Sequence, residues 1–131
     1  MTALLIGGGA GLAIVFFVMV KNALPPKPLR RARSQFESIV RHYAPSSRVS
    51  ISGGNFTPPV VWIKTATDAE RSILQMESSL LPRFEDILLG VGYPAIDIRL
   101  LQFVVESQET VNKDFGGKWG RRKYVWYRER F

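Results

Sequence analysis

The chain of 131 residues has no cysteine and only one histidine, His42. Without cysteine it has no disulfide framework, no thiolate zinc site, no cysteine nucleophile and no redox dithiol. Its first 20 residues also lack any charged side chain. Because the whole chain carries a formal net charge of +7, this uncharged start divides the sequence into two unlike parts.

The uncharged start has the length and composition of a membrane span. Residues 3–20 are apolar or glycine throughout, and a helix of that length covers roughly 27 Å, close to the hydrocarbon thickness of a bilayer. A cleaved signal peptide is disfavoured because no basic residue precedes the apolar run and no small-residue cleavage motif follows it. The sequence therefore predicts a transmembrane helix over residues 1–22.

Glycines within this segment are best explained by helix packing. Gly7, Gly8 and Gly11 lie close together on a helix surface, where another helix backbone can approach. A dinucleotide-binding loop is excluded because its third glycine position holds Leu12 and no acidic residue occurs before Glu37. We therefore expect a helix partner in the membrane.

Orientation follows from the cations after the span. Residues 23–28 are rich in proline and predict a stiff linker. The basic residues around this linker favour a cytoplasmic position, or the equivalent matrix or virion interior, for the C-terminal domain, with the N-terminus outside. They also suit contact with anionic lipid headgroups. These membrane-interface residues are Lys21, Lys27, Arg30, Arg31 and Arg33.

Residues 29–112 predict a small α+β domain with helices on one face of its sheet. The expected order is α-β-β-α-β, with a further short strand at Tyr124–Tyr127. Its segments are a helix over 29–43, strands over 48–52 and 60–64, a helix from Thr67 to Leu88, and a long strand over 96–105. Thr67 and Glu70 form a capping box, and Pro82 is expected to kink the helix or split it at Leu81. The alternation changes face at Leu100–Leu101, as a β-bulge or burial on both faces would allow.

Residues 113–131 predict a basic aromatic tail. Charge is segregated along the chain, with +6 over residues 21–48, −4 over 49–112 and +5 over 113–131. Interleaved cations and aromatic rings suit a protein partner, completion of the sheet, a lipid interface or nucleic acid. The residues expected to contact a partner or an anion are Lys118, Trp119, Arg121, Arg122, Lys123, Trp126, Arg128 and Arg130.

No catalytic pattern is found. His42 stands alone, no metal-ligand spacing occurs, and no serine lies in a nucleophile-elbow motif. The acidic pair Glu106 and Glu109 is expected on a solvated face. The sequence thus predicts a protein that is not an enzyme and that has no cofactor and no metal.

These features together predict a non-enzymatic, single-pass, membrane-anchored accessory subunit of a larger membrane assembly. Its expected partners are other membrane-protein subunits and anionic lipid, and a homo-oligomer is compatible with the glycine face. The alternative is a membrane tether for nucleic acid, such as a structural protein of a membrane-containing virion. A third hypothesis is an organiser of anionic lipid.

Overall fold

The computed structural model describes residues 27–53 and 59–130. The predicted span, its glycines Gly7, Gly8 and Gly11, the cation Lys21 and most of the proline-rich linker lie outside these residues. Within the described ranges, no helix combines the length and the apolar character needed to cross a bilayer.

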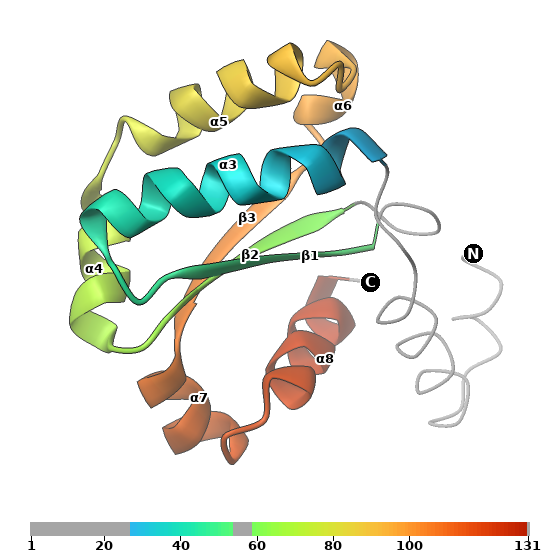
Figure 1. Cartoon of the computed structure of the whole chain (residues 1–131). Helices are drawn as coiled ribbons and strands as arrows, with labels where there is room; N and C mark the ends of the chain where they lie inside the picture. Colours follow the sequence, from blue (N-terminus) through green and yellow to red (C-terminus); the bar gives the residue numbers. More distant parts are fainter. Residues whose placement is uncertain (1–26, 54–58, 131) are drawn as a thin grey trace, which may run out of the picture.

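The fold is α+β, as predicted, with a three-stranded sheet in the order β1-β2-β3. Strands β1 and β2 are antiparallel, and β2 and β3 are parallel. Figure 1 shows α3 and α5 above the sheet and α7 and α8 below it. The bounds are α3 Lys27–Tyr43, β1 Arg48–Ser52, β2 Val60–Thr65, α4 Asp68–Met76, α5 Leu80–Gly90, α6 Ala95–Ile98, β3 Gln102–Ser107, α7 Gln108–Phe115 and α8 Trp119–Arg130.

The helix predicted over 29–43 is confirmed as α3, which buries one apolar face. Leu29, Ala32, Phe36 and Val40 recur at three- and four-residue steps, and all four are buried in α3. The helix begins at Lys27, so Pro28 belongs to its first turn and not to the linker. Proline is tolerated there because the first N–H groups of a helix have no partner within the helix.

The main core lies between α3, α5 and the upper face of the sheet. Phe36 packs edge-on against Phe84 with ring centroids 4.8 Å apart, and Phe84 stacks on Phe103 at 5.3 Å. These rings come from α3, α5 and β3, so they tie the helical layer to the third strand. The two strands predicted over 48–52 and 60–64 are confirmed, and they pair antiparallel with Val49 opposite Ile63.

The helix predicted from Thr67 to Leu88 is two helices. It splits between Met76 and Leu80, a few residues earlier than Leu81. Pro82 thereby falls in the first turn of α5, where its missing N–H removes no helical hydrogen bond. The split lets α4 pack beside β3 while α5 lies against α3.

The capping box is confirmed. The Thr67 side chain caps α4 by accepting a hydrogen bond from the Glu70 backbone N–H at 3.2 Å. Replacement of Thr67 by alanine is expected to lower the free energy of unfolding by about 1 kcal/mol. Urea denaturation of the two proteins measures this, and equal midpoints would show that the cap does not stabilise the fold.

Two strand predictions are wrong. The segment predicted as one strand over 96–105 contains the short helix α6 and then β3, so the change of face at Leu100–Leu101 marks the junction between them. Pro94 precedes α6 as its N-cap residue. The segment Tyr124–Tyr127 is part of α8, where the adjacent residues Trp126 and Tyr127 are both buried. Tertiary packing here overrides the β-propensity of aromatic residues.

Helices cover both faces of the sheet, contrary to the expectation of one. Trp126 and Tyr127 of α8 form a second core cluster with Val60 and Trp62 of β2. The Trp62 and Trp126 rings meet edge-on with centroids 5.8 Å apart. Residues 119–130 are therefore a packed helix of the fold.

Candidate functional site

The outer edge of β1 is closed by side chains of α3. The Val49 N–H donates to Glu37 Oε2 at 2.9 Å, and Arg33 Nη1 donates to the Val49 carbonyl at 3.2 Å. Arg33 and Arg41 hold the Glu37 carboxylate at 3.2 Å and 3.1 Å. Because the outward-pointing backbone groups of Val49 are already bonded, this edge is protected from pairing with another strand at that position.

The outer edge of β3 is different. The Gln102 N–H donates toward β2, to the Pro59 carbonyl at 3.3 Å. In a parallel ladder alternate residues face the same neighbour, so Phe103 and Val105 point their N–H and C=O groups away from the sheet. In the described ranges no side chain is hydrogen-bonded to them. The next outward N–H, that of Ser107, is bonded to Glu106 Oε1 at 2.9 Å.

A groove of about 390 Å³ lies beside this open edge. It is bounded by the end of α4, the start of α5 and β3. Its lining is mostly apolar, with Ile63, Leu74, Leu80, Leu81, Phe84, Leu101, Phe103 and Val105 joined by Gln75, Glu77 and Ser78. An extended segment paired with β3 would therefore find apolar contacts for side chains on one of its faces.

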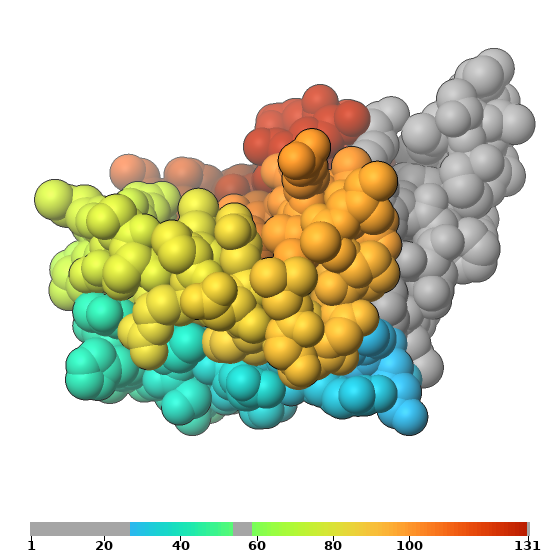
Figure 2. All heavy atoms as spheres, turned by 90° about the horizontal axis from the view of Figure 1, so that it is seen from above, coloured from blue at the N-terminus to red at the C-terminus, as the bar shows by residue number. Residues whose placement is uncertain are grey.

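Exposed apolar side chains gather on the connection between β2 and β3. Met76 is 84% exposed, and Leu81 and Leu89 are 53% and 52% exposed. Leu81 and Leu89 lie eight residues apart on α5. In Figure 2, α5 lies between the helices α4 and α6. Within the described residues, the large exposed apolar side chains all fall in this connection, as Ile73, Met76, Leu81, Leu89, Ile96 and Leu100. Such a concentration is typical of a docking surface.

The structure divides the predicted contact residues of the C-terminal segment into two groups. Trp126 is buried against Trp62, Arg122 pairs with Glu106 at 2.9 Å, and Trp119 Nε1 donates to Gln108 Oε1 at 2.8 Å. Lys123, which belongs to α8, is half-buried. The remaining four, Lys118, Arg121, Arg128 and Arg130, are exposed.

The two basic segments do not form one surface. The first basic segment belongs to α3, above the sheet, as Lys27, Arg30, Arg31 and Arg33. The C-terminal cations belong to α8, below the sheet, except Lys118, which directly precedes that helix. A nucleic acid that contacts both sets would have to pass around the sheet. Nucleic-acid binding and anionic-lipid binding stay predictions.

Glu106 is buried, contrary to the expectation of a solvated carboxylate. It is 5% exposed and accepts hydrogen bonds from Arg71 at 2.8 Å and Arg122 at 2.9 Å. Burial by itself would raise the pKa of Glu106, but the Ser107 N–H and the two guanidinium groups outweigh it and lower that pKa. The ion pairs join α4, β3 and α8. The sequence carries no signal for this, because the two arginines lie 35 and 16 residues away.

The sequence does not predict the open edge of β3, because its pattern predicts one strand over 96–105 where the structure has α6 and β3. No cluster of metal-ligating side chains occurs in the part of the chain that the structure describes. Comparison with protein families, with curated proteins and with solved structures finds no match for this chain. Its function therefore has to be inferred from its own residues.

Proposed function

We propose that this protein is a non-enzymatic accessory subunit of a membrane assembly, anchored by an N-terminal span and docked on a partner protein through the β3 edge. The proposal keeps the predicted order of a membrane helix, a short linker and an α+β domain. The α+β domain lies on the cytoplasmic side of the membrane, or in the equivalent matrix or virion interior. The occupant of the docking site is an extended, apolar segment of another subunit.

One observation carries this proposal: the outward-pointing backbone groups at the two edges of the sheet differ in their hydrogen bonding. Arg33 and Glu37 block the β1 edge at Val49, whereas Phe103 and Val105 leave theirs open beside an apolar groove. Proteins that work alone usually protect both edges, because an open edge invites pairing with another chain. One of the exposed apolar side chains of the neighbouring connection, Leu81, also lines this groove.

A charge at Leu81 tests the docking surface. Leu81 is exposed and lines the groove, so an aspartate there leaves the core of the domain intact but places a charge against an apolar partner. Leu81→Asp is expected to weaken the complex by about 2 kcal/mol or more, roughly thirty-fold. The measurement is dissociation of the assembly isolated from its native membrane in mild detergent.

The matched control is Gln35→Asp, which adds the same charge to an exposed position on α3. It is expected to leave the assembly intact. A photocrosslinker placed at Leu81 identifies the contacted chain. If Leu81→Asp and Gln35→Asp behave alike, docking at this edge is refuted. If the crosslink joins two copies of this chain, a homo-oligomer replaces the accessory subunit.

A further inference from the structure

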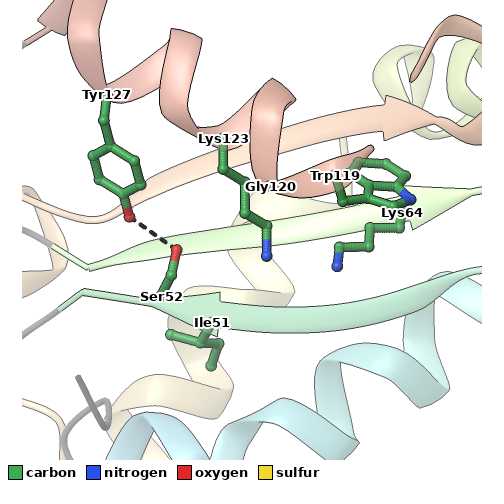
Figure 3. A pocket seen from close by; sticks show the side chains of 7 residues that line it. All are labelled: Ile51, Ser52, Lys64, Trp119, Gly120, Lys123 and Tyr127. Atoms are coloured by element: carbon green, nitrogen blue, oxygen red, sulfur yellow. Dashed lines mark hydrogen bonds between the residues drawn. The ribbon is translucent and has the colours of Figure 1, made fainter. Parts of the chain in front are cut away.

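A groove lies on the opposite face of the sheet, between β1, β2 and α8. It consists of two cavities of about 330 Å³ and 510 Å³, and both are lined by Lys64 and Trp119. Figure 3 shows the first cavity, with the side chains of Lys64 and Lys123 directed into the space beneath α8. The docking edge is formed by other residues, so this groove is a separate feature.

The sequence builds the groove from two regular patterns. On α8, Trp119, Lys123 and Tyr127 are spaced four residues apart and so share one helix face. On β1, Ser50 and Ser52 alternate toward α8, where Lys123 Nζ lies 3.4 Å from Ser50 Oγ and the Tyr127 and Ser52 hydroxyls are 2.8 Å apart. These contacts join β1 to α8, and the cavity lies beside them, with Ser52, Lys123 and Tyr127 in its lining.

Three cations line this groove, with Lys64 in both cavities, Lys123 in the first and Arg48 in the second. Arg48 lies directly opposite Lys64 in the β1–β2 register, so the two side chains project from the same face. The Lys64 side chain also interacts with that of Lys123, from the facing helix. Like charges at directly opposed positions destabilise a sheet. Among the described residues that line the two cavities there is no aspartate or glutamate.

The charge on Lys64 is disfavoured in the folded protein. Burial lowers the pKa of Lys64, and the interaction with the Lys123 side chain only partly opposes this. Its ammonium lies 4.9 Å from the centre of the Trp119 ring, a cation–π contact. The Trp119 ring is itself fixed by the hydrogen bond to Gln108. An anion in the groove would favour the charged form of Lys64 and reduce the repulsion.

We propose that this groove binds a phosphate group, with Arg48, Lys64 and Lys123 around its oxygens and the rest of the ligand along Trp119. A dianionic phosphate neutralises more of the positive charge that lines the groove than one carboxylate does, and it offers several acceptor oxygens to the ammonium and guanidinium donors. The source of the phosphate is a soluble phosphate ester or a phosphomonoester lipid headgroup. The two sources share this chemistry.

The test uses the full-length protein and its melting temperature. In neutral-lipid nanodiscs, inorganic phosphate and glycerol phosphate represent the soluble source. Nanodiscs containing phosphatidic acid, compared with others containing phosphatidylglycerol, represent the lipid source. A rise in melting temperature with the soluble phosphates assigns a soluble ligand, and a rise with phosphatidic acid above phosphatidylglycerol assigns the headgroup. If neither raises it, the proposal is overturned.

Substitution at Lys64 supplies the residue-specific readout. Lys64→Met keeps the length of the side chain and removes the charge, so we expect it to weaken phosphate binding at least tenfold and, without phosphate, to raise the melting temperature by about 4 °C. Lys113→Met removes one exposed charge from α7 and serves as the matched control. Arg48→Gln, at an exposed position, tests the site without disturbing the core. Phosphate responses equal to wild type in both Lys64→Met and Arg48→Gln would overturn the proposal.

Discussion

Glu106→Gln is expected to lower the free energy of unfolding by about 3–5 kcal/mol, because it leaves two partly buried guanidinium groups without their carboxylate. Glu106 is the common acceptor of Arg71 and Arg122. Glutamine preserves the shape of the side chain but not its charge. The measurement is equilibrium denaturation in urea at neutral pH.

Glu85→Gln, at an exposed position on α5, is the control and is expected to change stability by less than about 0.5 kcal/mol. The pH dependence gives a second check. The pKa of Glu106 is lowered from 4.5 in the folded protein, so its stabilisation is present above that pH and is lost as the pH falls below it. Asp68 and Glu70, whose pKa values are also lowered, act in the same direction. If Glu106→Gln unfolds at the wild-type midpoint, the network does not stabilise the fold.

Trp126→Ala is the second substitution with a large expected effect. Trp126 is 3% exposed and packs against Trp62, so its removal leaves a cavity under α8. The expected loss of unfolding free energy is about 3–5 kcal/mol. Thermal denaturation, followed by far-ultraviolet circular dichroism of the backbone, measures this loss of stability.

This substitution also distinguishes a packed helix from a solvated tail. Arg128→Ala, two residues further along α8 and exposed, is the control and should leave stability nearly unchanged. If Trp126→Ala is as stable as the wild type, residues 119–130 do not belong to the cooperative unit.

Elements with an unambiguous period were predicted well. The α3 face at Leu29, Ala32, Phe36 and Val40 follows the helical repeat, and the α4 cap at Thr67 follows a local capping rule. In both, neighbouring residues decide the structure. The α+β class follows from these elements, since alternating strands and amphipathic helices favour few other packings.

The errors lie where distant contacts decide the structure. The segment Tyr124–Tyr127 predicts a strand because aromatic and β-branched residues favour one. In the structure it is helical, because a helix lets Trp126 pack against the Trp62 ring while Tyr127 contacts the Ser52 hydroxyl. The basic tail likewise proved to be a helix whose inner face forms a groove. That face depends on the four-residue spacing of Trp119, Lys123 and Tyr127, which only a helix assignment makes visible.

The proposed site was harder to foresee than the fold. An open edge is a property of strand order, and the order β1-β2-β3 is not encoded in any local pattern. The lining of one groove by Arg48, Lys64 and Lys123 requires the β1–β2 register and the placement of α8 together. The predicted function therefore rested on charge and hydropathy, whereas the docking edge and the phosphate groove come from three-dimensional placement.

Amide hydrogen exchange at Phe103 and Val105 tests the docking of β3 most directly. Their N–H groups point away from the sheet, so they are expected to exchange rapidly in the isolated full-length protein and slowly in the assembly from its native membrane. The Gln102 amide, which is bonded to Pro59, is expected to be equally protected in both. Protection of Phe103 and Val105 that does not increase in the assembly would contradict strand addition at this edge.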